Sequence, residues 1–272
     1  MSGEARALLE VCVDSVAGCA AAARGGAGRV ELCADLVEGG VTPSLGTIEA
    51  ARECTRLPLV VLVRPRGGDF VYDADELDVL RRDVRHARRA GADGVALGVL
   101  APDGTVDRAA TRELVELARP MAVTFHRAFD HALDPLRALE ELAEIGVDRI
   151  LSSGGAARAE AGLERLADLV RRAAGRVSIL PAGGIRAHNV ARVLAATRAR
   201  EVHCSALAVA PSASLHHNEA CPLTSPPSTS PRERRVTRSA LVRAVVDAID
   251  RARPAWAEGR EKGPSEGAGR CG

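Results

Sequence analysis

Eight short apolar segments alternate with helical stretches along the chain, and this repeat constrains the fold more than any other feature. The predicted strands cover residues 8–14, 29–33, 58–65, 94–100, 121–126, 148–153, 176–182 and 200–206. A stretch with helical periodicity follows each strand, and this alternation predicts βαβ units and a parallel sheet. Eight such units predict an α/β fold, a single (β/α)8 TIM-like barrel. A doubly wound open sheet is the alternative, but no GxGxxG opens the first helical stretch.

The repeats span residues 8–253, so we expect one barrel domain rather than two. Residues 211–234 are rich in Pro and Ser and lie between the eighth strand and the last helix. This segment is predicted to be an irregular loop, acting as a lid or lacking order. Residues 254–272 show no apolar periodicity, which predicts a disordered tail.

Composition excludes several classes of protein. The net charge of +1 provides no field that would attract nucleic acid or a membrane surface. No apolar run approaches the ~20 residues of a membrane helix, and the first residues lack a secretory signal. We therefore expect a cytoplasmic protein with reduced thiols. The single Lys, Lys262, lies in the predicted tail, which excludes Schiff-base chemistry.

The polar residues of the predicted strands share one face of each strand. Side chains alternate along a strand, and the face that meets the helices has to be apolar. The polar face therefore points into the barrel, and it carries Glu10, Cys12, Glu31, Cys33, Thr124, His126, Glu201, His203 and Ser205. These residues crowd toward the C-terminal ends of the strands, where this architecture places active sites.

Two loop motifs add charged groups at the same end of the barrel. "VTFHRAFD" (123–130) follows the fifth strand and "RPRGGDF" (64–70) follows the third. The predicted substrate-binding residues are Arg64, Arg66, Asp69, Arg127, Asp130 and, after the sixth strand, Ser153. A ring of structural salt bridges is the alternative for each residue taken singly. The gathering of the whole set at one end favours a binding site.

The turns after the last two strands could bind an anion through backbone N–H groups. Gly183 and Gly184 follow the seventh strand, and Ser205 ends the eighth. Such turns often cradle a phosphate in this fold. The alternative is that the two Gly residues simply permit a tight turn.

Two of the seven Cys residues are candidate metal ligands. Cys12 and Cys33 lie on neighbouring strands with the same inward orientation, and adjacent strands are ~4.8 Å apart. Two thiolates suit a soft ion such as Cu(I). The alternative is that both are small buried hydrophobic residues. Cys19, Cys54 and Cys204 are interpreted as packing residues.

The motifs "EVCVDS", "GGAGRVELCADLVEGGVTPSLG", "VRPRGGDF", "VTFHRAFD" and "HCSA" resemble the CutC family of copper homeostasis proteins, from about residue 9 to 206. The resemblance implies a soluble TIM-like barrel that forms homodimers or homotetramers. It also implies a cytoplasmic location, nuclear as well in animals, and a link to copper tolerance. Cu(I) binding is assigned in animal members to two cysteines, which match Cys12 and Cys33 by motif position.

The chain departs from the family pattern at two places. Ala182 stands where the family usually has Gly, and its Cβ would narrow an anion site. The segment "LHHNEACPLTSPPSTSPRER" replaces an Arg-Asn element that precedes the last helix in the family. If that element closes the pocket in relatives, function would be weakened here.

Two hypotheses from different classes remain open, and the sequence does not decide whether the chain is an enzyme. In the first, Cys12 and Cys33 hold Cu(I) without turnover. In the second, the barrel mouth turns over a small anionic or phosphorylated substrate. Arg64 and Arg127 would bind the anion. The hypothetical acid and base residues are Glu10, Glu31, His126 and His203.

Overall fold

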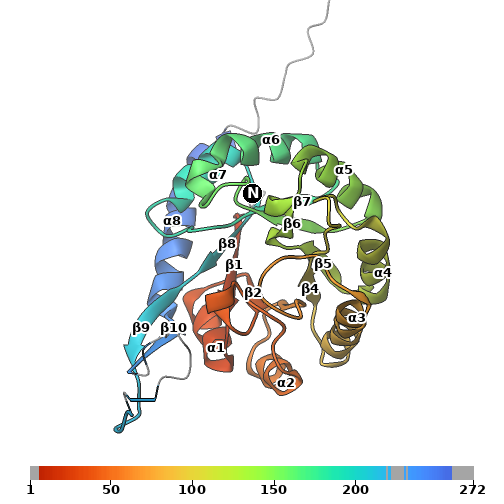
Figure 1. Cartoon of the computed structure of the whole chain (residues 1–272). Helices are drawn as coiled ribbons and strands as arrows, with labels where there is room; N and C mark the ends of the chain where they lie inside the picture. The colour runs from red at the N-terminus through yellow and green to blue at the C-terminus, as the bar shows by residue number, and fades with distance from the viewer. Residues whose placement is uncertain (1–5, 219, 222–229, 231, 259–272) are drawn as a thin grey trace, which may run out of the picture.

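The protein is a barrel of eight parallel strands surrounded by helices (Figure 1). The computed structural model describes residues 6–218, 220–221, 230 and 232–258. The barrel strands are β1 (Leu8–Val13), β2 (Arg29–Leu32), β3 (Leu59–Leu62), β4 (Gly94–Leu97), β5 (Ala122–Phe125), β6 (Arg149–Ser152), β7 (Ser178–Pro181) and β8 (Glu201–Ser205). All eight predicted strands and the predicted TIM-like fold are confirmed.

A helix follows each barrel strand, directly or after a loop, and covers its outer side. The α-helices are α1 (Val16–Gly25), α2 (Leu45–Cys54), α3 (Ala74–Arg89), α4 (Arg108–Ala118), α5 (Pro135–Ile145), α6 (Leu163–Ala173), α7 (Val190–Thr197) and α8 (Ser239–Glu258). Short 3-10 turns are η1 (Leu36–Glu38), η2 (Arg127–His131) and η3 (Ala159–Ala161). Local signals set the ends: Asp73 and Glu76 form a capping box on α3, and left-handed Gly146 ends α5.

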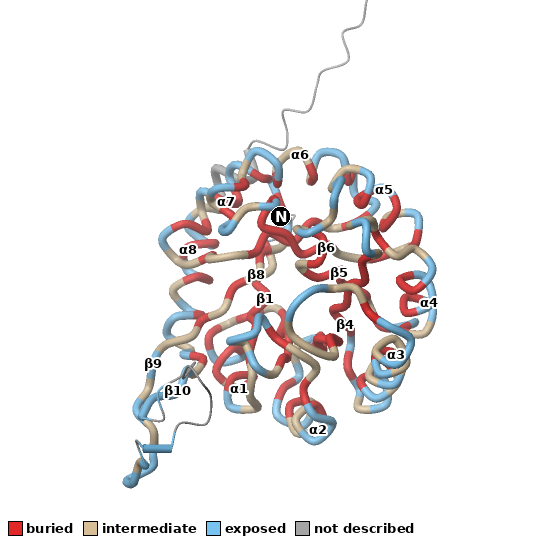
Figure 2. Tube along the Cα trace, in the orientation of Figure 1, coloured by how far each residue is buried: buried red, intermediate tan, exposed pale blue. Residues whose placement is uncertain are grey.

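The main hydrophobic core lies between the strands and the helices. Figure 2 shows the strands as the most continuously buried part of the trace. Phe125 and Phe129 both lie in this core, so the two aromatic residues that flank the His126–Arg127 pair anchor this region between the strands and the helices. Two small apolar groups fill part of the barrel interior, formed by Cys12, Cys33, Val60, Leu62 and Ala96 and by Leu151, Leu180 and Ala182.

The barrel closes between β7 and β8, which are the two ends of the hydrogen-bonded strand order. Side chains bridge this seam inside the barrel. The carboxylate of Glu201 on β8 accepts hydrogen bonds from Ser178 on β7 at 3.0 Å and from Arg149 on β6 at 3.1 Å. The same carboxylate also pairs with Arg29.

An antiparallel arm is the feature that the sequence did not predict. Strands β9 (Leu207–Pro211) and β10 (Glu233–Thr237) pair with each other and project from the barrel between β8 and α8 (Figure 1). The segment 211–234, expected to be irregular throughout, therefore has strand residues at both ends. Residues 219, 222–229 and 231 lie outside the described residues.

The last helix also differs from the expectation. α8 continues to Glu258, so the first part of the predicted tail 254–272 is helical. Residues 259–272 lie outside the described residues. Within the described residues, none of the helices has the combined length and apolar character needed to cross a bilayer.

We expect the contact between the first and last helices to tolerate no added methyl group. In α1, a Cβ on Gly25 would lie 2.9 Å from the carbonyl oxygen of Ser239 and closer still to Val242 in α8. Gly25→Ala is therefore expected to lower the free energy of unfolding by about 1–3 kcal/mol through overpacking. Urea unfolding followed by circular dichroism measures this change.

Gly46→Ala is the matched control. Gly46 lies in α2, and no heavy atom lies within 4 Å of the position of an added Cβ. Because Ala forms helix more readily than Gly, this variant is expected to gain up to about 1 kcal/mol. Equal losses in both variants would contradict the close α1–α8 contact.

Candidate functional site

Strand register places three charged residues side by side inside the barrel. Glu10 on β1 lies opposite His203 on β8 and opposite Arg29 on β2. Glu10 Oε1 is 2.7 Å from His203 Nδ1, and Glu10 Oε2 accepts a hydrogen bond from Arg29 Nε. All three side chains are almost completely enclosed. The carboxylate of Glu10 therefore compensates two neighbouring cationic groups away from solvent.

This pairing fixes the charge of Glu10. Burial alone would raise its pKa, but the hydrogen bond from His203 and the charge of Arg29 hold the pKa of Glu10 at about 2. Burial lowers the pKa of His203, but hydrogen bonds with Cys12 and Glu10 outweigh burial and raise it well above its ordinary value. Glu10 is thus an ionised partner of His203, which does not favour the predicted role as a base.

The two predicted metal-ligating thiols meet one level above this row. Cys12 lies opposite Glu31 in the strand register, and Cys33 follows directly after β2. The Sγ atoms of Cys12 and Cys33 are 3.5 Å apart, and both residues are buried. Glu31 Oε2 lies 3.6 Å from Cys33 Sγ and 3.9 Å from His203 Nε2. Cys12, Glu31 and Cys33 each offer one ligand atom within a group no wider than 4.8 Å.

The pKa values of the acidic and thiol groups in this cluster shift in different directions. The hydrogen bond from Cys33 outweighs burial and lowers the pKa of the Cys12 thiol to about 6. The same hydrogen bond and burial raise the pKa of Cys33 well above its ordinary value. Burial raises the pKa of Glu31 to about 8, against the charge of His203. Cys12 is therefore the more acidic thiol of the pair, and Cys33 Sγ donates a hydrogen bond to Glu31 Oε2 at 3.6 Å.

A cavity of about 310 Å³ opens above the thiols at the barrel mouth. It is lined by Cys12, Glu31, Glu38, Gly39, Leu62, Arg64, Gly68, Phe70, His126, Arg127, His131, Leu151 and His203. Six residues of the predicted site thus share one chamber: Cys12, Glu31, Arg64, His126, Arg127 and His203. Cys33 and Glu10 do not line it, but each contacts a residue that does.

Arg64 is a buried cation in the wall of this cavity. Its Nη1 donates to the carbonyl oxygens of Glu38 at 2.9 Å and Gly40 at 2.8 Å, and its Nη2 donates to that of Gly68 at 2.8 Å. The guanidinium also lies 5.0 Å from the ring centroid of Phe70. No carboxylate of the described residues forms an ion pair with Arg64. Its charge is therefore solvated by carbonyl groups and an aromatic ring but is not neutralised.

His126 presents an unpaired N–H group beside Arg64. The backbone N–H of Ala128 donates to His126 Nδ1 at 3.2 Å, which leaves the proton of the neutral ring on Nε2. Burial and the nearby charge of Arg64 lower the pKa of His126 to about 3, so the ring is neutral at pH 7. Its Nε2 is buried and has no hydrogen-bond partner. An added Cβ on Gly98 would lie 2.6 Å from the ring, so this residue leaves the space that the imidazole occupies.

Several other predicted binding residues do not line the cavity. Arg66 pairs with Asp69 and Glu76. Gly183 and Gly184 have positive φ angles, as the tight-turn alternative requires. Ser205 accepts a hydrogen bond from Arg186 at 3.4 Å.

Asp130 and Ser153 do not line the cavity either, and they form hydrogen bonds with each other instead. The carboxylate of Asp130 accepts from the Ser152 hydroxyl at 2.6 Å, from Arg127 Nε at 2.8 Å and from the backbone N–H groups of Ser153 and Gly155 at 3.0 Å. Arg127 Nη2 completes the cluster by donating to the Ser153 hydroxyl at 2.8 Å. Asp130 therefore clamps the loop after β6 to the loop after β5.

Sequence reasoning missed several residues around the cavity. Phe70 contacts both imidazoles, with ring centroids 5.1 Å from His126 and 5.4 Å from His131. The scarcity of Phe in the chain was a signal that applied to Phe70 as much as to the Phe residues beside His126. Arg29 lies two residues before Glu31 on β2. Because side chains two residues apart share a face of a strand, its inward orientation could have been predicted in the same way.

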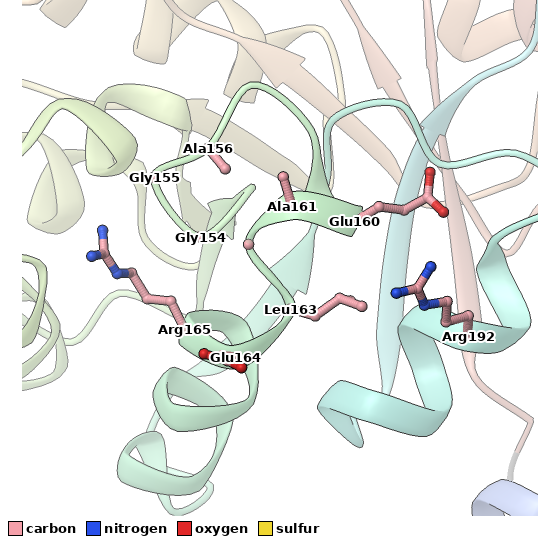
Figure 3. Close-up of a pocket in the computed structure, with 10 residues that line it drawn as sticks. Gly154, Gly155, Ala156, Glu160, Ala161, Leu163, Glu164, Arg165 and Arg192 are labelled. Carbon is pink, nitrogen blue, oxygen red and sulfur yellow. The ribbon is translucent and has the colours of Figure 1, made fainter.

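A hollow larger than the mouth cavity lies elsewhere in the described residues. It has a volume of about 570 Å³ and lies between the loop after β6 and the starts of α6 and α7. Figure 3 shows Arg165 on the opposite side of this hollow from Glu160 and Arg192. Its lining contains no thiol or imidazole group, so the mouth cavity is the better candidate for chemistry.

Asp130→Asn is expected to destabilise the protein by about 1–3 kcal/mol, because an amide nitrogen would replace one acceptor oxygen. Burial raises the pKa of Asp130, but hydrogen bonds from Ser152 and Arg127 outweigh burial and lower it. A lowered pKa stabilises the folded state above the unfolded pKa of about 4, and this contribution is lost as pH falls through the folded pKa. Urea unfolding at a series of pH values should show the difference between the two proteins shrinking below about pH 4. A difference that stays constant at all these pH values would contradict the clamp.

Comparisons with known proteins identify the family of this chain. The CutC family model matches residues 7–208. The mouse copper homeostasis protein cutC homolog is 45% identical over 224 residues, which cover 78% of this chain and 82% of the mouse protein. The human homolog is 42% identical and covers 88% of this chain and 87% of its own length. A family protein CutC from Xanthomonas campestris pv. campestris is 52% identical over 73% of this chain and 82% of its own length.

A solved structure of a CutC protein is also similar to this chain. The CutC structure from Streptococcus agalactiae has a TM-score of 0.69 and 30% identity, and it covers 72% of this chain and 97% of its own length. Phosphoribosylanthranilate isomerase from Thermotoga maritima, with a TM-score of 0.55 and 11% identity, is similar in fold alone. The chain belongs to the CutC family of copper homeostasis proteins.

Proposed function

We propose that the protein binds one Cu(I) ion through Cys12 and Cys33 beneath the mouth cavity. The observation that carries this proposal is the 3.5 Å separation of two buried sulfur atoms. Metal–sulfur bonds of ~2.3 Å allow both sulfurs to reach the same ion. Soft thiolate ligands select Cu(I) over the hard cations that carboxylates prefer.

The surroundings of the two thiols support the binding of a soft cation. The lowered pKa of Cys12 means that little proton competition opposes its coordination at neutral pH. Glu31 and His203 lie around the sulfurs. Glu10 holds His203 by Nδ1, and this leaves Nε2 on the side of Glu31. A carboxylate that orients a histidine in this way is common around metal sites.

The positions of the two thiols relative to the mouth cavity also support a site that an ion enters from the mouth. Cys12 lines the cavity, while Cys33 lies behind it and is almost fully enclosed. An ion that enters from the mouth therefore meets Cys12 first, and Cys33 becomes its second ligand. Such an order suits a protein that buffers or delivers copper.

An enzyme acting on a small anionic or phosphorylated substrate is the second candidate function. The observation that favours it is the pairing of an unneutralised Arg64 with an unpartnered His126 in the same cavity. A copper-binding pair of thiols leaves both features unexplained.

Replacement of either ligand thiol is expected to weaken Cu(I) binding. Cys12→Ser and Cys33→Ser should each lower the Cu(I) affinity of the reduced protein at least about 100-fold, since even partners outside the ligand set change metal affinity by 10–100-fold. Competition with a chromogenic Cu(I) chelator measures this affinity. The wild type should take up one ion per chain in the same experiment.

Cys204→Ser is the matched control. Cys204 is buried in β8 directly beside His203, but it belongs to the core between the strands and the helices. This variant should keep the affinity of the wild type. A Cys12→Ser/Cys33→Ser protein that still binds one Cu(I) ion with wild-type affinity would overturn the proposal.

A further inference from the structure

We propose that the mouth cavity is a binding site for a small organic carboxylate, whose oxyanion is held by the Arg64 guanidinium and the His126 Nε2–H. This inference goes beyond copper binding and does not depend on it. Three features of the cavity carry it: an unneutralised cation, an unpartnered donor and an apolar surface that joins the two.

The first feature is the charge of Arg64. A buried cation is normally paired with an anion, because removing it from water is costly. Arg64 is only 6% exposed, yet its guanidinium hydrogen bonds go to three backbone carbonyl oxygens. These bonds fix the side chain without neutralising its charge. The cavity beside it therefore favours an anionic group.

The second feature is the free donor on His126. Buried polar groups in native proteins almost always have hydrogen-bond partners, and an exception calls for an explanation. His126 is 5% exposed, its Nδ1 already accepts from Ala128, and its Nε2 has no acceptor. An oxygen atom of a ligand in the cavity would supply the missing acceptor. A neutral imidazole contributes this hydrogen bond without adding charge.

The third feature is Phe70, which joins the two groups. Its ring centroid lies 5.0 Å from the Arg64 guanidinium carbon and 5.1 Å from the centroid of the His126 ring. The cation and the donor therefore lie on one wall of the cavity. Leu62 and Leu151 also line the cavity and provide apolar contact for the carbon atoms of a ligand.

Charge favours a carboxylate over a phosphate. The second arginine of the cavity, Arg127, already pairs with Asp130 at 2.8 Å, and His203 pairs with Glu10 at 2.7 Å. Arg64 is therefore the cation available to a ligand. The acidic side chain of Glu38 lines the same cavity and would repel a second negative charge. The volume of about 310 Å³ lies at the lower end of ligand cavities, ~300–1,000 Å³, which suits a molecule of a few carbon atoms.

The test uses the full-length, reduced, copper-free protein with pyruvate, propionate and inorganic phosphate as probes. Long-range ¹H–¹⁵N NMR spectra of the histidine rings report the environment of His126 Nε2. We expect pyruvate and propionate to shift this resonance in a saturable way and phosphate to bind more weakly. No saturable shift with either carboxylate in the tens of millimolar would overturn the site. Tighter binding of phosphate would overturn the assignment to carboxylates.

Matched arginine variants locate the site. Arg64→Gln should weaken pyruvate binding at least about tenfold, because a charge-assisted hydrogen bond is lost. Arg66→Gln is the control, since Arg66 pairs with Glu76 and does not line the cavity. Unchanged pyruvate affinity in Arg64→Gln would contradict the proposal.

Two further variants test the site without relying on Arg64→Gln. Arg64 holds two loops through its carbonyl contacts, so Arg64→Gln could fail to fold. His126→Phe then removes the Nε2–H donor while keeping a ring, and calorimetry should show weaker pyruvate binding than in the wild type. The Cys33→Ser protein should bind pyruvate as the wild type does, because Cys33 does not line the cavity. Retained carboxylate binding with lost Cu(I) binding, or the reverse, separates this proposal from that of copper binding.

Discussion

The buried carboxylate of Glu10 is the group on which the arrangement of the barrel interior depends. It lies between Arg29 and His203 on the two neighbouring strands and satisfies both. Charges that are withdrawn from water are stable only when they are paired and hydrogen-bonded. Arg29 also pairs with Glu201, and the carboxylate of Glu201 bridges β7 and β8 where the barrel closes. One chain of contacts therefore connects the charged groups beside the thiols with the strands that close the barrel.

The interior of this barrel combines charged side chains with small apolar groups. TIM barrels are usually filled by layers of branched aliphatic residues. Here the strands β8, β1 and β2 contribute charged side chains, whereas Leu151 and Leu180 on β6 and β7 form an apolar group. The two thiols lie where the charged row meets another apolar group, which contains Val60 and Leu62. The hydrogen bond between the two thiols moves their pKa values apart: it lowers the pKa of Cys12 and, together with burial, raises that of Cys33.

The sequence predicted the strands and their inward faces because a period of two leaves little freedom once one face must be apolar. Glu10, Cys12, Glu31 and His203 were all placed inside the barrel on that ground, and the structure brings them together. It could not reveal which polar residues satisfy one another. Apart from Arg127, the partners of Asp130 lie more than twenty residues away, and such pairings depend on loop geometry that no local pattern encodes. The β9–β10 arm escaped prediction for the same reason, since its strands are joined across a long polar segment.

Because of the antiparallel arm, the number of residues between β8 and α8 can change without changing the barrel. The family model stops matching at residue 208, close to the point where the chain leaves β8 for the arm. Pairing between β9 and β10 brings the chain back beside its point of departure, so α8 begins in the same place however long the excursion is. Doubling the length of a flexible loop costs only about 0.6 kcal/mol. Insertions and deletions at the tip of the arm can therefore accumulate during evolution with little effect on the chamber where the thiols and Arg64 lie.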